Sequence, residues 1–257
     1  SILWNEEANV KNALKEKSDI LLYIGTESPY DSRSVGLAKA AINVLKRSGI
    51  DFGVLGIEEV NSGDLPLRLG EKGLFEEFAE RNLKLFQKTG VSKIVALSPH
   101  DYHTFIRDYP PEIKNFEVEH ITTFLAKLIE EGRIKFGRVE KENIVTYKDP
   151  CYLGRYNGIF EEPREVVKSI GGLNLLEMDA TKEMAICCGG GGGAFWLKLR
   201  KRKRAVKILL DQCIGMNVDM LITACPVCTM MFKDELPSLE KSMEVLSLTE
   251  VVEKYMV

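Results

Sequence analysis

The sequence predicts an α/β protein of two pseudo-symmetric Rossmann-like domains, each with a parallel sheet, that arose by internal duplication. Short β-branched or apolar runs alternate with amphipathic stretches, which is typical of parallel sheets covered by helices. The same order of elements then returns in the second half, together with motifs at nearly equal spacing. The chain has 257 residues and is 45% hydrophobic, so it can bury a core without disulfides.

The predicted elements follow one another as strand, helix, strand, helix and strand in each half. In the first half, strand-like runs lie at residues 19–25, 52–56 and 93–98, and helix-like stretches at residues 34–49 and 71–90. In the second half, strand-like runs lie at residues 143–149, 174–179 and 219–224, and helix-like stretches at residues 162–172 and 197–217. Each helix-like stretch ends near a Gly or Asn, as C-caps commonly do.

The two halves also agree in sequence detail. "ILLYIGTESPYDSR" in the first half faces "IVTYKDPCYLGR" in the second, and "VSKIVALSPHDYHTF" faces "VDMLITACPVCTMMF". "NSG" at residues 61–63 stands where the second half has "CCG" at residues 187–189. Because the polar stretch "GRIKFGRVEKE" separates the halves, we place one domain at residues 1–137 and the other at residues 138–257.

Charge and composition limit where the protein works. A net charge of −3 gives no overall attraction to nucleic acid or to anionic membranes. No apolar run approaches the ~20 residues of a membrane span, and "SILWNEEANV" lacks the basic start and apolar centre of a signal peptide. We therefore expect a cytoplasmic protein. The missing initial Met indicates a processed chain or a fragment of a longer one.

Five of the six cysteines form one spaced pattern in the second half. There are 35 residues between Cys151 and the adjacent pair Cys187 and Cys188, and 36 more before the "CPVC" motif of Cys225 and Cys228. Each motif follows or closes a strand-like run, so in a parallel sheet all five thiols would gather at the carboxyl edge, where such sheets bind ligands. Converging thiolates suit soft metals, and iron-sulfur clusters before most others.

Other uses of these thiols stay open at the level of residue chemistry. A structural zinc ion held by four of the five cysteines is one alternative, because "CPVC" has the spacing of a zinc knuckle. A redox-active dithiol at Cys225 and Cys228 is another. Disulfides are not expected in a reducing compartment. Cys213 lies on an apparent apolar helix face, and we interpret it as a core residue.

The five glycines after Cys188 have a candidate purpose beside a metal cluster. A backbone without side chains at Gly189, Gly190 and Gly191 could approach the cluster closely and direct N–H groups at its sulfides. A flexible loop is the alternative. Phe195 and Trp196 follow directly, and we expect them to shield the site from water.

These residues resemble the cysteine-rich CCG domain of heterodisulfide reductase catalytic subunits. The family's relatives include iron-sulfur subunits of glycolate, lactate and glycerol-3-phosphate oxidising complexes, subunits of dissimilatory sulfur metabolism, and some archaeal succinate dehydrogenases. The resemblance rests on the five cysteines together with "DPCYLGRYNG" at residues 149–158, and it extends over nearly the whole chain. It implies a noncubane 4Fe-4S cluster held by Cys151, Cys187, Cys188, Cys225 and Cys228, with Cys187 and Cys188 carrying the reactive sulfur positions.

The first half departs from the family pattern. Thr26, Asn61–Ser62–Gly63 and Ser98–Pro99–His100–Asp101 stand where the first set of cysteines would be. Hydroxyl, amide and carboxylate groups are poor ligands for an iron-sulfur cluster, so we expect none there. This half would be structural or would form a wall of the pocket. His100 and Asp101 are candidate proton donors to the cluster of the other half, with a vestigial loop as the alternative. His103 and His120 are expected to be structural.

The chain lacks the closely spaced cysteines of the ferredoxin-like module that many relatives carry. A single cluster without a relay implies partner subunits that deliver electrons, of the ferredoxin-like, flavin or membrane-bound quinone kind. The resemblance thus implies an oxidoreductase subunit for disulfide and thiol chemistry on a small substrate, cytoplasmic or peripheral on the cytoplasmic face of a membrane complex. A pure electron-transfer subunit and a zinc-stabilised structural subunit are the alternatives.

The segment "KLRKRKR" at residues 198–204 carries most of the local positive charge. It is either a solvated helix face or an anion site for the sulfonate or phosphate groups of thiol cofactors. Because no aromatic residues are interleaved with the basic ones, nucleic acid is not an expected partner.

Overall fold

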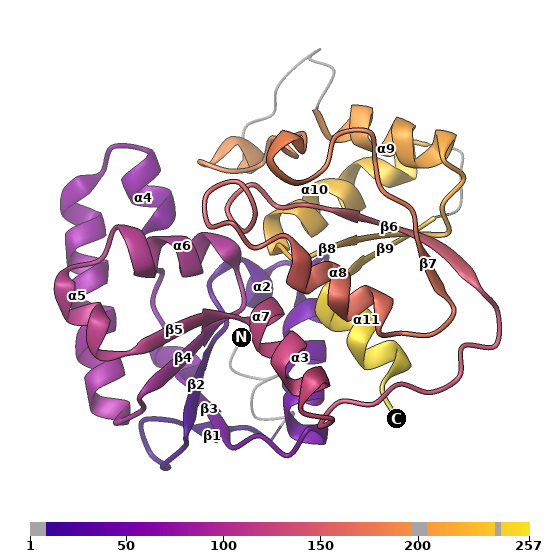
Figure 1. The fold of residues 1–257 in the computed structure, drawn as a ribbon. Coiled ribbons are helices and arrows are strands. Elements are labelled where there is room, and N and C mark those ends of the chain that lie inside the picture. Colours follow the sequence, from indigo (N-terminus) through magenta and orange to yellow (C-terminus); the bar gives the residue numbers. More distant parts are fainter. Residues whose placement is uncertain (1–8, 197–204, 240–242) are drawn as a thin grey trace.

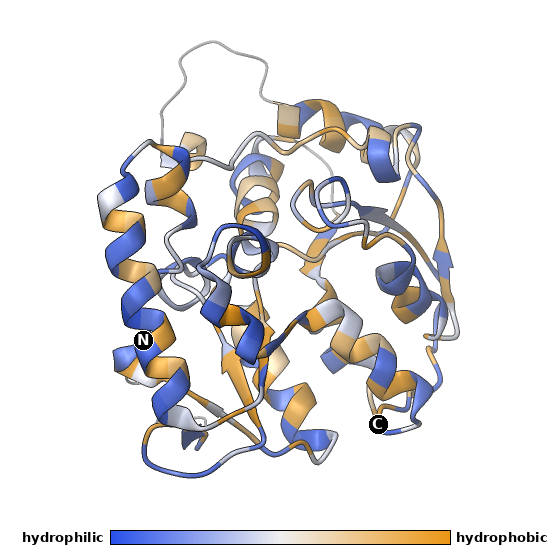
Figure 2. Ribbon diagram, turned by 60° about the vertical axis from the view of Figure 1, so that its left-hand side comes forward, coloured by the Kyte–Doolittle hydropathy of each residue, from blue (hydrophilic) through white to orange (hydrophobic). Residues whose placement is uncertain are grey.

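Two parallel β-sheets with covering helices make up the chain in the computed structural model, which describes residues 9–196, 205–239 and 243–257 (Figure 1). The predicted α/β class is therefore confirmed. One sheet lies before the predicted boundary at residue 137 and the other after it. Figure 2 shows that the strands in the middle of the molecule are predominantly hydrophobic, whereas the outer helices alternate between hydrophilic and hydrophobic faces.

The first sheet has the order β1-β3-β2-β4-β5, and all of its strand pairs are parallel. Its strands are β1 (Lys11–Asn12), β2 (Ile20–Tyr23), β3 (Phe52–Val54), β4 (Lys93–Ala96) and β5 (Glu117–His120). The α-helices of this half are α2 (Glu27–Tyr30), α3 (Val35–Arg47), α4 (Asp64–Arg68), α5 (Lys72–Thr89), α6 (Pro99–Arg107) and α7 (Ile121–Glu130). Two 3₁₀ helices, η1 (Gly56–Glu58) and η2 (Pro111–Asn115), complete it.

The second sheet has the order β7-β6-β8-β9 and is also parallel. Its strands are β6 (Asn143–Lys148), β7 (Leu173–Leu175), β8 (Met220–Thr223) and β9 (Glu244–Ser247). The α-helices are α8 (Glu161–Lys168), α9 (Ala205–Gly215), α10 (Pro226–Glu235) and α11 (Leu248–Tyr255). The 3₁₀ helices are η3 (Lys182–Met184), η4 (Ala194–Trp196) and η5 (Leu236–Ser238).

The two sheets repeat one another in order and in register. Without β1, the first sheet reads β3-β2-β4-β5, which matches β7-β6-β8-β9 position for position. Tyr23 of β2 pairs with Ala96 of β4, and Lys148 of β6 pairs with Thr223 of β8. Ala96 and Thr223 each lie two residues before the motif residues Ser98 and Cys225. Tyr23 is therefore the structural counterpart of Lys148.

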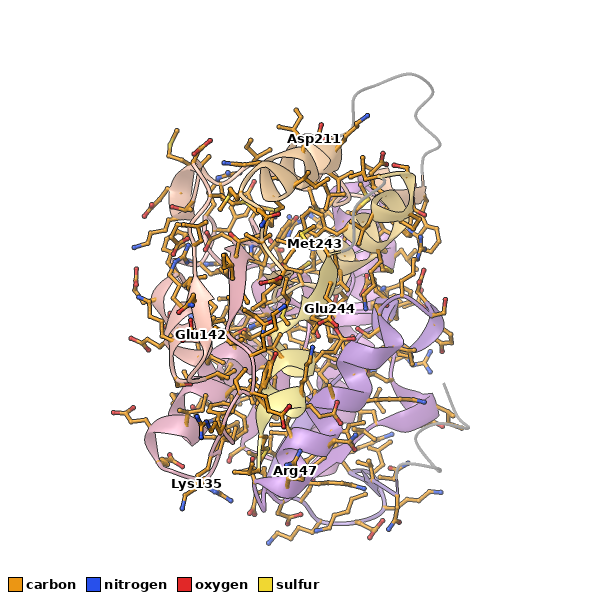
Figure 3. All side chains as sticks on the ribbon, turned by 90° about the vertical axis from the view of Figure 1, so that its right-hand side faces the viewer. Arg47, Lys135, Glu142, Asp211, Met243 and Glu244 are labelled. Atoms are coloured by element: carbon orange, nitrogen blue, oxygen red, sulfur yellow. The ribbon has the colours of Figure 1, made fainter. Side chains whose placement is uncertain are left out.

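The halves pack against each other through a shared hydrophobic core. Helices α3 and α7 of the first half contact α11 and α8 of the second half, respectively. Buried residues of all four helices belong to one cluster, which includes Leu45, Leu125, Val167 and Val252. Figure 3 shows the yellow α11 beside the violet α3, where the Arg47 guanidinium donates a hydrogen bond of 2.7 Å to the carbonyl oxygen of Met256.

Some element boundaries differ from the predicted ones. The strand predicted at residues 174–179 ends at Leu175, because Glu177 turns away to pair with Arg164 of α8. The units β5–α7 and β9–α11 were not predicted at all. Of the helix predicted at residues 197–217, only α9 falls within the described residues, and residues 197–204 with the predicted anion site lie outside them.

None of the helices in the described part of the chain combines the length and the hydropathy that crossing a bilayer requires.

Candidate metal centre

The five motif cysteines lie at the carboxyl edge of the second sheet, beside the central strands β6 and β8. Cys151 follows β6, Cys187 and Cys188 lie in the loop after β7, Cys225 is the N-cap of α10, and Cys228 lies in its first turn. The order in which the chain adds strands reverses between β6 and β8, and ligands of open α/β sheets bind at such a switch point. Parallel strand topology thus brings together thiols that are up to 77 residues apart in the sequence, from 151 to 228.

The thiols form two close pairs. The sulfurs of Cys151 and Cys187 are 3.9 Å apart, and those of Cys188 and Cys228 are 3.4 Å apart. Cys188, Cys225 and Cys228 are buried, whereas Cys151 and Cys187 are half-buried. All six cysteines of the chain are free thiols. The group therefore has a buried side and a side that substrate or solvent can reach.

Electrostatics single out Cys187 within this group. The pKa of Cys187 lies well below its usual range, because the thiols of Cys151 and Cys188 donate hydrogen bonds to its sulfur. The backbone N–H of Gly189 adds a further donor at 3.3 Å. The negative charge of the exposed thiol pair is thus concentrated on Cys187.

Sequence reasoning missed Lys148, the last residue of β6. Its side chain is fully buried, and its Nζ donates to the sulfur of Cys228 at 3.4 Å. Burial alone would lower the pKa of Lys148, but the charges of Cys228 and Cys188 hold it well above its usual value. The only signal in the sequence was a lysine three positions before Cys151 in an otherwise buried run.

A buried ion pair fixes the chain between Lys148 and Cys151. The Arg164 guanidinium of α8 donates to both carboxylate oxygens of Asp149, at 2.8 and 2.9 Å, and the backbone N–H of Lys182 adds a bond of 2.9 Å. The side chains of Asp149 and Arg164 are each only 2% exposed. This bidentate geometry positions the loop that carries Cys151.

The glycine run packs between the two halves of the molecule. A Cβ atom at Gly190 would meet Val227 and Met231 of α10 at 2.8 Å, and one at Gly191 would lie 3.3 Å from Cε1 of His100. Gly189 and Gly192 have φ angles of 81° and 59°, which side chains rarely adopt. The loop is therefore closely packed at Gly190.

The aromatic residues after the glycines do not both shield the site. Trp196 is 67% exposed, so the expectation that it excludes water is wrong for this residue. Phe195 is partly buried against the C-terminal core, and the guanidinium of Arg33 lies 4.9 Å from its ring centre. The exposed indole follows from the 3₁₀ turn of η4, which directs the two rings apart at 79°.

His100 of the first half reaches the second half. Its Nδ1 lies 3.0 Å from Oδ2 of Asp64, and its ring stacks on Tyr152, the neighbour of Cys151, with 4.1 Å between ring centres. Burial would lower the pKa of His100, but the hydrogen bond and charge of Asp64 raise it above its usual value. His100 thus forms part of the wall beside the glycine loop.

Asp101 lies differently from its neighbour His100. Its Oδ1 accepts a hydrogen bond of 2.5 Å from Ser62, and its Oδ2 lies beside Gly25 in the first half. The remaining motif positions of this half are also paired, since Asn61 donates to the Thr26 hydroxyl at 2.8 Å. Asp101 is therefore engaged within its own half.

The other two histidines have local partners. The Nδ1 atom of His120 accepts a hydrogen bond from the backbone N–H of Thr122 at the start of α7. His103 lies 3.2 Å from the side-chain nitrogen of Asn157 and packs edge-on against Tyr152. Cys213 on α9 is fully buried among Leu209 and other apolar residues, and burial raises the pKa of its thiol to about 12.

The donor set fits an iron-sulfur group better than a single ion. Among the described residues, no three cysteine, histidine or carboxylate side chains converge on one point as they would around one metal ion. The two thiol pairs instead offer sulfur ligands on both sides of a space at the sheet edge. Thiolates are the ligands that iron-sulfur clusters use, and the buried ammonium of Lys148 favours an anionic group beside them.

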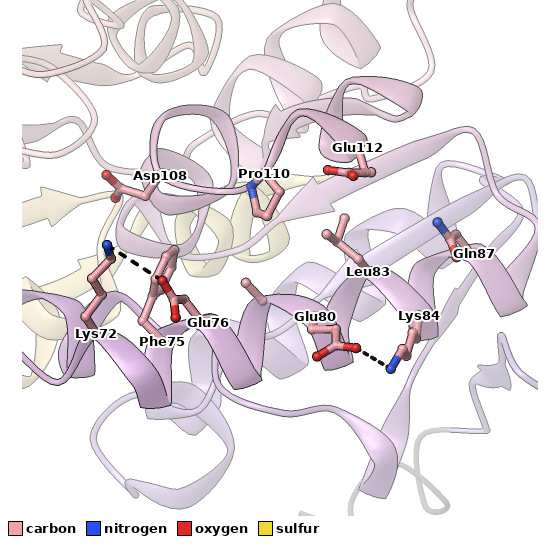
Figure 4. A pocket seen from close by; sticks show the side chains of 11 residues that line it. Lys72, Phe75, Glu76, Glu80, Leu83, Lys84, Gln87, Asp108, Pro110 and Glu112 are labelled. Carbon is pink, nitrogen blue, oxygen red and sulfur yellow. Dashed lines mark hydrogen bonds and ion pairs between the residues drawn. The ribbon is translucent and has the colours of Figure 1, made fainter.

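A surface pocket of about 520 Å³ lies elsewhere, along α5 and the turn before η2. Figure 4 shows the ion pairs Lys72–Glu76 and Lys84–Glu80 on its α5 side, with Phe75 and Leu83 between them. None of the cysteines lines it.

A parallel α/β sheet with five thiols at its carboxyl edge defines a cysteine-rich α/β domain. Residues 145–233 match the family described as CCG, cysteine-rich domain, and this part of the chain belongs to that family. The match begins in β6 and ends in α10, so it contains all five motif cysteines.

The chain is similar to several curated proteins. It is 38% identical to a probable iron-sulfur-binding oxidoreductase, FadF, of Bacillus subtilis (strain 168), over 90% of this chain and 34% of that protein. It is 36% identical to an EtfAB:quinone oxidoreductase of Syntrophomonas wolfei, over 98% of this chain and 37% of that protein. It is 34% identical to one subunit of a dihydromethanophenazine:CoB–CoM heterodisulfide reductase of Methanosarcina barkeri, over 93% and 59%. The chain thus spans about a third to three fifths of these relatives.

Among solved structures, a hypothetical protein from Helicobacter pylori has a similar fold. The TM-score is 0.54 with 12% sequence identity, over 93% of this chain and 49% of that one. At this identity the likeness concerns the fold alone.

Proposed function

We propose that the chain is the iron-sulfur subunit of an oxidoreductase, and that Cys151, Cys187, Cys188, Cys225 and Cys228 hold one noncubane-type 4Fe-4S cluster. The observation that carries this proposal is the gathering of five free thiols at one sheet edge, with sulfur pairs at 3.4 and 3.9 Å. The adjacent Cys187 and Cys188 belong to different pairs, so they can hold two irons of an opened cluster. The glycines at 189–191 leave the backbone free to approach it.

The chemistry that such a cluster supplies is the transfer of single electrons to or from sulfur. Cleaving one disulfide consumes two electrons and two protons and yields two thiols, and forming it releases the same number. Within this chain, Cys151 and Cys187 form the side that a small thiol or disulfide can reach, because they are the half-buried members of the group. The cluster-bearing cysteines are therefore the reactive positions.

His100 is placed to handle the proton of this reaction. The imidazole is held by Asp64 and by Tyr152, and it lies against Gly191 of the loop that carries Cys187 and Cys188. A protonated His100 can donate to the sulfur that leaves as thiolate. Asp101, the second candidate in the sequence, is committed to Ser62 and serves the architecture of the first half.

Electrons come from partner subunits. The relatives that the chain matches are described as oxidoreductases or as part of a heterodisulfide reductase, and they are longer than this chain. Ferredoxin-like, flavin or membrane-bound quinone partners fit the need for a one-electron donor or acceptor. With a membrane-bound partner, the chain would sit peripherally on the cytoplasmic face.

A pure electron-transfer function is the second candidate. It is favoured by the similarity to the EtfAB:quinone oxidoreductase, which extends over 98% of this chain. In that case the cluster would pass electrons between a flavin subunit and a quinone-linked partner without touching a disulfide.

Electron paramagnetic resonance of the oxidised protein separates the two functions. We expect oxidation in the presence of the correct thiol to give a new signal, because the thiol sulfur binds at the cluster. A spectrum that no candidate thiol changes, in protein with full iron content, would favour the electron-transfer function. Zinc at about one per chain without iron would instead indicate the zinc-stabilised structural subunit.

A further inference from the structure

Lys148 is a buried cation whose partner is a sulfur atom. Its residue is 2% exposed, and its Nζ donates to Sγ of Cys228 at 3.4 Å. No carboxylate in the described part of the chain forms an ion pair with it. Because an ammonium group loses its hydration on burial, an uncompensated lysine at this place would destabilise the fold.

The carboxylate next in sequence is already committed. Both oxygens of Asp149 accept hydrogen bonds from Arg164, at 2.8 and 2.9 Å, and one of them also accepts the backbone N–H of Lys182. The negative charge that compensates Lys148 therefore has to come from the thiol side, where Cys188 and Cys228 are buried with it.

The first half of the molecule provides an internal comparison. The register of the two sheets makes Tyr23 the counterpart of Lys148. Tyr23 is fully buried and neutral, and its hydroxyl donates to the carbonyl oxygen of Val60. The half without thiols thus has no cation at this position, and the half with five thiols has one.

We propose that Lys148 is the built-in counter-cation of the thiol-bound cluster and that it raises the reduction potential of that cluster. This inference rests on the proposed iron-sulfur function. Each electron that enters adds one negative charge to the site. A fixed positive charge in the poorly polarisable interior stabilises the reduced state more than the oxidised state. Local charge and hydrogen bonds to sulfur are known determinants of cluster potentials.

The test compares three variants of the full chain, purified without oxygen, with the wild-type protein. Lys148→Met removes the charge at similar length, and Lys148→Arg keeps it. Lys182→Met is the matched control, because the Lys182 side chain is 41% exposed and pairs with Glu161 at the surface. Iron and sulfide content and the midpoint potential from a redox titration are measured for each.

We expect K148M to retain iron and to shift to a more negative midpoint potential by at least 59 mV, which is a tenfold change in a one-electron equilibrium. K148R and K182M are expected to stay near the wild-type value. If K148M loses its iron while K148R keeps it near the wild-type potential, the need for a positive charge is likewise supported.

Two results would overturn the inference. One is an unchanged midpoint potential in iron-loaded K148M. The other is loss of iron from both K148M and K148R, which would assign Lys148 a role in shape rather than in charge. Absence of iron from the wild-type protein would contradict the proposed function itself, and the inference with it, so the two failures are distinguishable.

Discussion

Ser62 donates a hydrogen bond of 2.5 Å to Asp101 at the positions where the other half places the sulfur of Cys188 3.4 Å from that of Cys228. The remaining positions behave in the same way. Asn61 donates to Thr26 at 2.8 Å, where the other half has Cys187 and Cys151 at 3.9 Å. The first half therefore keeps the pairwise contacts of the site but makes them with hydrogen bonds. Such contacts stabilise the loops without a metal group.

This pairing predicts the effect of Ser62→Ala. The change leaves the buried Asp101 carboxyl without the hydrogen bond from Ser62, which costs about 1–3 kcal/mol in the free energy of unfolding. Iron content stays at the wild-type level, because no cluster ligand is touched. Urea unfolding and iron analysis measure both quantities, with the exposed Ser238→Ala as control. Iron loss in the Ser62 variant would show that the first half contributes directly to the cluster.

The ligand set predicts different outcomes for two buried cysteines. Cys188→Ser loses or rebuilds the cluster, because a hydroxyl is a poor ligand for iron in such a group. Cys213→Ser retains full iron, since its thiol packs among the apolar residues of α9. The two thiols have similar burial, which makes Cys213 a matched control. Anaerobic iron and sulfide analysis decides, and iron loss in the Cys213 variant would make the proposed ligand set wrong.

Close packing of the glycine loop predicts the effect of Gly190→Ala. The new methyl group would meet Val227 and Met231 at 2.8 Å, within the first turns of α10, which also carries Cys228. Overpacking of this kind costs about 1–3 kcal/mol. The matched control is Gly171→Ala, where a Cβ has no neighbour within 4 Å. Equal free energies of unfolding for the two variants would show that the loop is not closely packed.

Glu59 predicts a pH-dependent stability. Its carboxyl tip turns inward to the backbone N–H groups of Gly25, at 2.8 Å, and Ile24, at 3.3 Å, and burial raises its pKa from 4.5 to about 8. The folded state thus binds more protons than the unfolded state between these values, so the free energy of unfolding falls as pH rises from about 5 to about 8.

The variant Glu59→Gln reproduces the neutral carboxyl and is expected to remove this decline. The wild-type protein should lose on the order of 2–4 kcal/mol more than the variant over that range. Urea unfolding at several pH values measures the difference. Identical pH profiles of the two proteins would contradict the inward position of the Glu59 carboxyl.

The proposed proton donor predicts a pH-dependent rate. Disulfide reduction should slow as pH rises through the pKa of His100, which Asp64, Glu27 and Asp101 raise above its usual value against the effect of burial. His100→Gln should lower the rate about 10²-fold and remove this pH limb, with iron content unchanged.

His103→Gln is the control for this variant, because His103 packs against the same Tyr152 without contacting Asp64. A His100 variant that keeps both the wild-type rate and the wild-type pH profile would remove His100 from the reaction.

Much of the architecture follows from local signals. Alternating strand and helix patterns require parallel pairing, and parallel pairing places the ends of β6, β7 and β8 at one edge. For that reason the sequence predicted the gathering of the thiols. The short strands β5 and β9 begin with exposed glutamates at the sheet edges, so their apolar pattern was too weak to find.

The missing parts of the site depend on contacts between distant segments. A lysine after a strand normally reaches solvent, so nothing local indicated that Lys148 is buried against Cys228. The stacking of His100 on Tyr152 joins the two halves and follows from their docking. Trp196 is apolar in the sequence, but its exposure is set by the direction of the turn at η4.

Metal and sulfide analysis of the anaerobically purified chain tests the central claim most directly. The account predicts about four irons and about four sulfides per chain, with little zinc, and loss of this iron in the Cys188→Ser variant. Zinc at about one per chain without iron or sulfide would contradict it.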